Sequence, residues 1–67
     1  MTKMENYVQK VRWEKNWSQG QLARISKVSQ STICDIENGN RIPNLETALK
    51  LSKALSQSVD SLFKLTT

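Results

Sequence analysis

Two serines that can each begin a helix lie close together in this 67-residue chain, and their spacing constrains the fold more than any other feature. Ser18 opens the stretch Ser-Gln-Gly-Gln at 18–21, a capping box in which the serine oxygen and the Gln21 side chain each satisfy a free backbone donor. Ser29 offers a second N-cap. Only a helix of about two turns and a tight turn fit between the two starts. The sequence therefore predicts consecutive short helices at 19–26 and 30–37.

Three further helices are expected, and no strand, because nothing in the sequence alternates with period two. The first runs from about Met4 to Lys15, the fourth follows the N-cap Asn44, and a last short helix begins after Ser58. The apolar residues of these helices and of the two central ones supply the core. They are Met4, Val8, Val11, Leu22, Ala23, Ile25, Ile33, Ile36, Leu45, Ala48, Leu49, Leu51, Ala54, Leu55, Val59, Leu62 and Phe63.

Length and composition exclude several classes of protein. We expect one domain over residues 1–67, with its core at about 4–65. The chain has no histidine, no paired carboxylates at a defined spacing and no glycine-rich phosphate loop, so we expect no catalytic residues, no metal or cofactor site, no small-molecule ligand and no enzyme. The lone Cys34 suits a space-filling thiol rather than a redox switch. Without a signal peptide or a membrane span, a cytoplasmic, nucleoid-associated protein is expected.

The charge and the central helix pair both suit nucleic acid. Ten Lys and Arg against six Asp and Glu give a net charge of +4, which fits a polyanionic partner, although many small domains carry such an excess for solubility alone. Small Ala23 lets the second helix of the pair approach the first, and Val28 fills the turn. In that geometry one helix crosses the DNA backbone while the next enters the major groove.

The ordered set of motifs resembles the phage repressor and Cro family over about residues 8–64. The matching stretches are 17–23 (WSQGQLA), 28–33 (VSQSTI), 36–39 (IENG), 41–45 (RIPNL), 54–55 (AL) and 59–63 (VDSLF). The resemblance implies an all-α, compact five-helix, lambda-repressor-like domain whose second and third helices form the helix-turn-helix. It also implies sequence-specific binding of double-stranded DNA by a transcriptional regulator, either a repressor or an autoregulatory controller.

The resemblance places the base-reading residues at the start of the third helix. Gln30 and Ser31 fall in its first turn, where Gln suits bidentate bonds to adenine and Ser can contact a base or a phosphate. Asp35 lies one turn further on and could accept from a cytosine amino group. As an anion near phosphates it could equally be a solvated or locally paired carboxylate.

Phosphate contacts are expected on both sides of that helix. Gln19 matches a family position that reaches a phosphate and can brace Gln30, and Arg41 is the strongest cationic candidate. Helix-start and loop donors add further contacts. The remaining candidates are Ser18, Asn40, Lys27 and Thr32, with Arg24 weaker.

Other matched positions imply structural roles. Arg12 and Glu37 match a partly buried ion pair that makes no base contact. Lys27 stands where the family usually has glycine, so a left-handed backbone there would cost about 1 kcal/mol. Trp17 matches an apolar core site, whereas Trp13 stands where a polar residue is usual, and its role is left open.

One recognition helix reads too few base pairs to define a site, so family members usually bind near-palindromic operators as two-fold dimers. The expected homodimer surface is the last helix and its flanks, with Leu65, Leu62 and Phe63 as candidates; the latter two could instead close the core of one chain. The alternative function is a protein-interaction module on the same scaffold, such as an antitoxin-like partner-binding protein. Gln19, Gln30, Ser31 and Arg41 argue against that alternative, and Asp35 argues for it.

Overall fold

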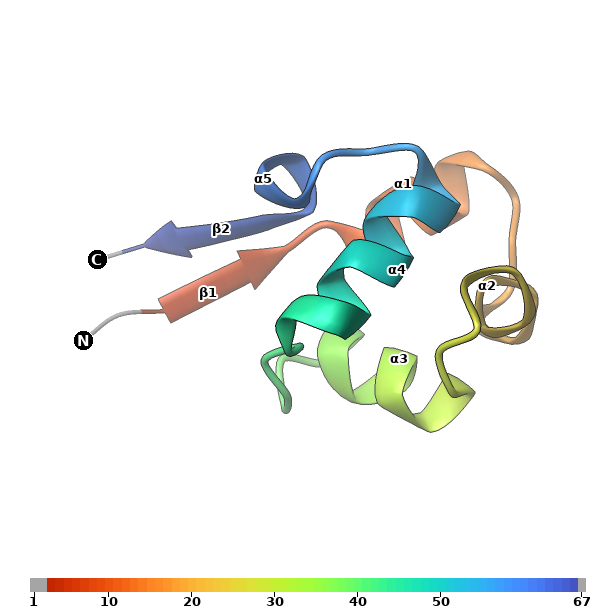
Figure 1. Ribbon diagram of the computed structural model, residues 1–67, viewed down its shortest axis with the longest axis horizontal. Coiled ribbons are helices and arrows are strands. Elements are labelled where there is room, and N and C mark those ends of the chain that lie inside the picture. Colours follow the sequence, from red (N-terminus) through yellow and green to blue (C-terminus); the bar gives the residue numbers. More distant parts are fainter. Residues whose placement is uncertain (1–2, 67) are drawn as a thin grey trace.

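The computed structural model describes residues 3–66, and a long central helix organises them. The elements in chain order are β1 (Lys3–Asn6), α1 (Val8–Glu14), α2 (Gln19–Ser26), α3 (Gln30–Glu37), α4 (Leu45–Leu55), α5 (Val59–Leu62) and β2 (Phe63–Thr66). Figure 1 shows α4 in the middle, with α2 and α3 at one end and below, and the two strands projecting from the opposite end. The predicted five-helix fold with a helix-turn-helix is confirmed.

Helices α2, α3, α4 and α5 begin where the sequence predicts, because their caps are local. The Ser18 hydroxyl accepts from the Gln21 backbone N–H at 3.1 Å, and the Ser18 N–H donates to Gln21 Oε1 at 2.7 Å, which completes the capping box. Ser29 and Asn44 cap α3 and α4 by accepting from the backbone N–H of Thr32 and Thr47, without the reciprocal bond. Lys27 ends α2 with a left-handed backbone, φ 61°, as expected for the glycine position that it occupies.

The expectations of a first helix from Met4 and of a chain without strands are wrong. Residues Lys3–Asn6 instead form β1, which pairs antiparallel with β2 so that Met4 lies opposite Leu65. Asn6 ends the strand: its side-chain oxygen accepts from the Val8 N–H, and its amide donates to the Ile36 carbonyl in α3 at 2.9 Å. The two strands are far apart in sequence and have only four residues each. No local sequence pattern therefore predicts their pairing.

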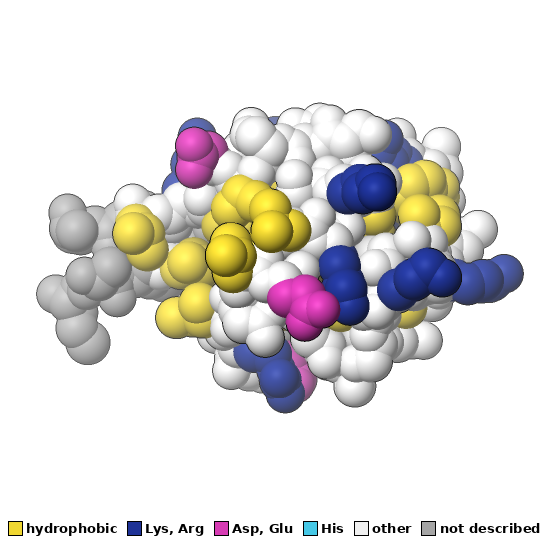
Figure 2. Space-filling view, in the orientation of Figure 1, with side chains coloured by type: hydrophobic (Ala, Val, Ile, Leu, Met, Phe, Trp, Pro, Cys, Tyr) yellow, Lys and Arg dark blue, Asp and Glu magenta, His cyan; other side chains and the backbone are white. Residues whose placement is uncertain are grey.

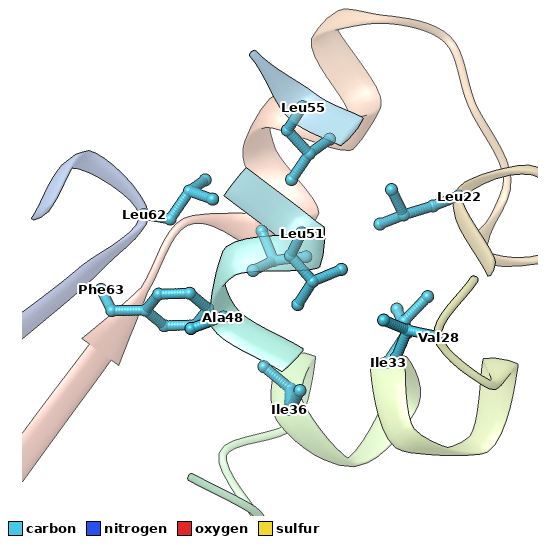
Figure 3. Close-up of a cluster of buried hydrophobic side chains, with 10 residues drawn as sticks. Leu22, Val28, Ile33, Ile36, Ala48, Leu51, Leu55, Leu62 and Phe63 are labelled. Atoms are coloured by element: carbon cyan, nitrogen blue, oxygen red, sulfur yellow. The ribbon is translucent and has the colours of Figure 1, made fainter. Parts of the chain in front are cut away.

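The core lies between α4 and the surrounding helices (Figure 3). Ile33 and Ile36 face inward as predicted, and Val28 fills the helix-turn-helix turn. Phe63 points toward Ala48 in α4. The buried set, which accounts for most of the predicted core, is Val8, Leu22, Val28, Ile33, Ile36, Ala48, Leu51, Leu55, Leu62 and Phe63.

Three residues that we assigned to the apolar core lie largely in solvent. Ile25 is 50% exposed, Leu49 53% and Leu45 72%. The stripe of α4 that contacts the core contains Ala48, Leu51 and Leu55, so Leu45 and Leu49 face outward. Neighbouring elements cover one face of each helix, and an apolar residue beside that face stays exposed.

The structure confirms the core site predicted for Trp17 and shows Trp13 at the surface. Trp17 is half-buried and packs against the core, at the apolar site that it matches. Trp13 is 60% exposed, and its ring lies 5.9 Å from the Arg12 guanidinium carbon. No other contact in the described residues assigns Trp13 a role.

Candidate nucleic-acid interface

The first turn of α3 presents polar side chains to solvent. Gln30 and Ser31 are both exposed, directly after the N-cap Ser29. The Gln30 side-chain oxygen lies over α2, 3.5 Å from the point where a Cβ on Gly20 would stand. The amide and hydroxyl of this turn are therefore accessible to a base edge. Thr32 is less accessible, because it is half-buried and its hydroxyl accepts from Ser29 Oγ at 2.7 Å.

The turn between α2 and α3 fixes the angle at which this face is held. Val28 is buried between the helices, and its N–H donates to the buried hydroxyl of Ser26 at 3.3 Å. The left-handed Lys27 lets the chain reverse within three residues. The close packing of α2 and α3 that small Ala23 and Val28 predicted is present.

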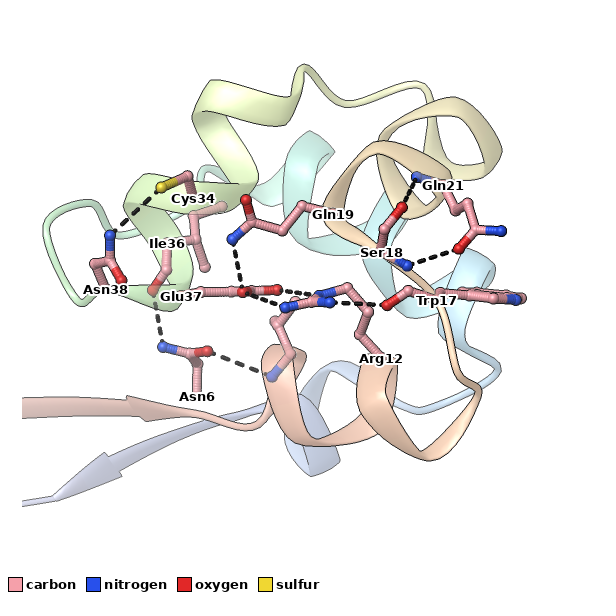
Figure 4. Close-up of polar contacts among 11 residues, drawn as sticks. Asn6, Arg12, Trp17, Ser18, Gln19, Gln21, Cys34, Ile36, Glu37 and Asn38 are labelled. Carbon is pink, nitrogen blue, oxygen red and sulfur yellow. Dashed lines mark hydrogen bonds and ion pairs between the residues drawn. The ribbon is translucent and has the colours of Figure 1, made fainter.

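A buried ion pair anchors the far end of α3 (Figure 4). Arg12 from α1 donates from Nε to Glu37 Oε2 at 2.8 Å and from Nη2 to Oε1 at 3.0 Å, and from Nη1 to the Trp17 carbonyl at 2.8 Å. The side chains of Arg12 and Glu37 are only 7% and 0% exposed. The hydrogen bond to Glu37 raises the pKa of Arg12, and burial opposes that rise. The predicted structural ion pair is confirmed.

Gln19 joins this pair rather than bracing Gln30. Its side-chain amide donates to Glu37 Oε1 at 3.0 Å, whereas we expected it to brace the first residue of the recognition helix. The Glu37 carboxylate thus accepts three hydrogen bonds, from α1 and from the first turn of α2. The buried carboxylate attracts this amide because each added donor offsets the cost of burying its charge.

A second acid–base pair lies on the solvent side of α3. Arg41 Nη2 stands 3.6 Å from Asp35 Oδ2, with 55% of the arginine and 43% of the aspartate side chain exposed. The loop after α3 is held to the helix by the Asn40 N–H, which donates to the Asp35 carbonyl at 2.8 Å. Of the two readings left open for Asp35, the free protein shows the locally paired carboxylate.

The predicted phosphate-binding residues flank α3 on two sides. Ser18 and Gln19 lie at the start of α2, and Asn40 and Arg41 follow the end of α3. All of these except half-buried Gln19 are exposed. Lys27, also exposed, lies apart from both groups, at the turn before α3.

Two of the three predicted dimer residues belong to the core of the single chain. Leu62 and Phe63 are buried against α4, so assigning them to a dimer interface is wrong, and their core alternative is correct. Leu65 is 68% exposed, as an interface residue requires. Sequence reasoning missed its exposed apolar companions on the loop and α4, which are Ile42, Leu45 and Leu49.

Within residues 3–66, no three His, Cys, Asp or Glu side chains come together as metal ligands would. In that same stretch, every helix is too short or too polar to span a bilayer. Cys34 is a half-buried free thiol that the Asn38 amide approaches at 3.4 Å.

Known proteins with similar sequences and structures point to one family. The sequence model of the helix-turn-helix family matches residues 8–62. An uncharacterized HTH-type transcriptional regulator, YgzD of Bacillus subtilis (strain 168), is 36% identical over 60 residues, covering 90% of this chain and 91% of that protein. The restriction-modification controller protein C.AhdI from Aeromonas hydrophila has a similar structure, with a TM-score of 0.76 and 31% identity. That match covers 81% of this chain and 82% of C.AhdI.

Proposed function

The chain belongs to the Cro/C1-type helix-turn-helix family and is a DNA-binding transcriptional regulator, and on that premise we propose that it represses transcription by binding near-palindromic operators as a homodimer. The observation that carries the proposal is the exposed polar first turn of α3, held rigidly by the buried Arg12–Glu37 pair at its other end. A reading surface needs side chains free to bond and a backbone that does not move.

In this proposal α3 enters the major groove and its first turn reads the bases. Gln30 has a free amide that can bond N6 and N7 of one adenine, and Ser31 offers one hydroxyl to a base or a phosphate. Asp35 accepts from a cytosine amino group once Arg41 leaves it for the DNA backbone. Breaking the Asp35–Arg41 pair costs little free energy, because the two charged groups are 3.6 Å apart and both side chains are exposed.

The backbone contacts come from the two groups that flank α3. Ser18 and Gln19 bring hydroxyl, amide and helix-start N–H groups to one phosphate strand. Asn40 and Arg41 bring an amide and a cation to the other strand, and Lys27 and Thr32 add weaker contacts at the edge. Such contacts set register and orientation and make affinity depend on salt.

A second copy covers the exposed apolar residues on one side of the molecule, which we call the α4–β2 face. It comprises Ile42, Leu45, Leu49 and Leu65. Figure 2 shows hydrophobic side chains gathered on the left half of the view, over the start of α4 and the strands. Exposed apolar side chains gathered on one face mark association sites in small soluble proteins. A two-fold axis there leaves both copies of α3 free for half-sites about 10 bp apart.

An autoregulatory role fits the size of the described domain. C.AhdI, a similar protein of about the same span, is a restriction-modification controller. With regulation by its own concentration, a dimer of weak affinity would bind its operator only above a threshold amount of protein. The proposed place of action is the nucleoid in the cytoplasm, and no catalytic role is proposed.

The test is selection of duplexes from a random library at physiological salt, followed by binding measurements on variants. An inverted repeat should be enriched. Gln30→Ala should relax the preference at one position per half-site, worth about 1–3 kcal/mol of discrimination. Arg41→Ala should weaken all duplexes alike and lower the salt slope by about one per bound subunit, or about two for the dimer. Lys64→Ala, which removes an exposed charge on β2, is the matched control.

The dimer is tested separately by sedimentation. Leu65→Lys combined with Leu49→Lys should yield a monomer that still folds, because both residues are exposed in the single chain. That variant should prefer single half-sites. If the duplex selection enriches no sequence above a salt-sensitive background, the proposal of sequence-specific DNA binding is overturned. A double variant that stays dimeric would overturn the α4–β2 face.

A further inference from the structure

A groove lies between the end of α2 and the second half of α4, and it shares only Lys27 with the surfaces described so far. We call it the α2–α4 groove. Its volume is about 440 Å³, and its lining residues are Ile25, Ser26, Lys27, Lys50, Lys53 and Ala54. Ile25 is the residue of α2 that we expected in the core and that is instead half-exposed. The Ile25 side chain, which does not enter the core, therefore lines this groove.

The groove combines an apolar floor with a cationic rim. Ile25 and Ala54 supply the floor, and three exposed lysines surround it. No Asp or Glu occurs among the lining residues in the described chain, 3–66. Figure 2 shows Lys and Arg side chains gathered on the right half of the view, around hydrophobic surface. An acid next to this rim, Glu46, lies 3.7 Å from the Lys50 amine and is highly exposed, so the ion pair between them is weak.

The position of the groove separates it from DNA reading. Ser18 and Gln19 lie at the opposite end of α2, and none of Gln30, Ser31 or Arg41 lines the groove. Lys27 alone belongs to both surfaces. A phosphate strand is bound through charge and hydrogen bonds and gains nothing from an apolar floor. The floor and the rim together match a ligand that is both apolar and anionic.

We propose that the α2–α4 groove binds an acidic amphipathic segment of a partner protein. One large apolar side chain of that segment packs on Ile25 and Ala54, while its carboxylates pair with Lys50 and Lys53. A protein segment fits better than a small molecule, because Ile25 and the lysines are too exposed to enclose a small ligand, whereas a helix laid across them buries the floor. This inference goes beyond DNA binding and does not depend on it.

The test uses a peptide of about 12 residues, with Leu at helical spacing and Asp or Glu elsewhere, and a scrambled peptide of the same composition without an apolar face. Binding to the full chain is followed by amide chemical shifts and by titration. Shifts should concentrate at the end of α2 and the second half of α4. Lys53→Glu and Ile25→Ser should each lower the affinity at least about tenfold. Lys64→Glu, the same charge change on β2, should change it less than about twofold.

Three outcomes of the peptide experiment would overturn the inference. They are no saturable binding of the amphipathic peptide, equal binding of the scrambled peptide, and equal loss in Lys53→Glu and Lys64→Glu. Lys50→Gln, a milder change, replaces Lys53→Glu if that variant does not fold by circular dichroism. Lys53→Glu and Lys64→Glu should change DNA affinity to the same extent, since both alter the net charge equally; a larger loss with a flatter salt slope in Lys53→Glu would make the groove a phosphate contact and also overturn the inference. Peptide binding by a protein that enriches no DNA sequence would support the groove and reject the operator proposal.

Discussion

Helix α3 carries two Arg–carboxylate pairs, two residues apart, that differ in nearly every physical respect. Glu37 is held by Arg12 through two hydrogen bonds of 2.8 and 3.0 Å, with the side chains 0% and 7% exposed. Asp35 meets Arg41 through a single contact of 3.6 Å, with both side chains about half exposed. The residue types are the same, and the surroundings decide what each pair does.

The buried pair fixes the helix, whereas the exposed pair can exchange partners. Removing one member of a buried pair leaves an uncompensated charge, so the pair cannot open without a large cost. An exposed pair contributes little, because water and salt replace the partner. The recognition helix therefore has one end bound to α1 and α2 and one face whose charges are free to meet a ligand.

The largest expected effect comes from breaking the buried pair. Arg12→Ala should lower the free energy of unfolding by about 3–5 kcal/mol, since it leaves the Glu37 carboxylate without its main donors. Urea denaturation followed by circular dichroism measures this. Because domains of this size have only a few kcal/mol of stability, much of the variant should be unfolded at 37 °C. A loss below about 1 kcal/mol would show that the pair is not a structural anchor.

Gln19→Ala should have an intermediate effect, about 1–2 kcal/mol on unfolding, because it removes one donor to a charged acceptor and leaves the arginine in place. The same change in a Glu37→Gln background should be smaller, and the difference measures the coupling between the two residues. Full additivity in this cycle would mean that Gln19 does not act on stability through Glu37.

The exposed pair should contribute little to stability. A double-mutant cycle with Asp35→Asn and Arg41→Gln should give a coupling of about 0–1 kcal/mol in urea unfolding, vanishing near 1 M salt. A coupling above about 2 kcal/mol would erase the contrast between the two pairs. The single changes should act mainly on DNA affinity, with Arg41→Gln weakening binding.

The smallest expected effect is on pH dependence. The pKa of Arg12 is raised in the folded chain, so its contribution is fully present below the pKa of the unfolded chain and is lost only as the pH rises through the still higher folded value. Both lie above the usual working range. The difference in unfolding stability between wild type and Arg12→Ala should therefore stay constant from about pH 6 to pH 9. A decline within that range would show that another group carries the interaction.

The sequence predicted best what is decided within a few residues. The starts of α2, α3 and α4 were predictable because Ser18, Ser29 and Asn44 each bond a backbone N–H three residues later. The Arg12–Glu37 pair joins residues 25 apart, and only the family resemblance indicated it.

Contacts between distant segments could not be predicted in this way. The strands were missed because β1 has no partner until β2 returns to it. Ile25, Leu45 and Leu49 were misplaced because a helix with surplus apolar residues does not specify which of them the neighbours will cover. The sequence left two roles open for Asp35, a contact to a base and a local ion pair, because it does not show whether an arginine lies within reach of the carboxylate.

The β1–β2 ribbon has a consequence for the order in which the chain folds. Its register, which runs from Lys3 opposite Thr66 to Asn6 opposite Phe63, joins residues far apart in sequence, so the entropy of closing that loop is the largest in the described chain. The local turns of α2 and α3 require no such closure and can form early. We therefore expect the ribbon to form after α2 and α3 and to open before them, so that the strand amides exchange their hydrogens faster than those of the helix-turn-helix.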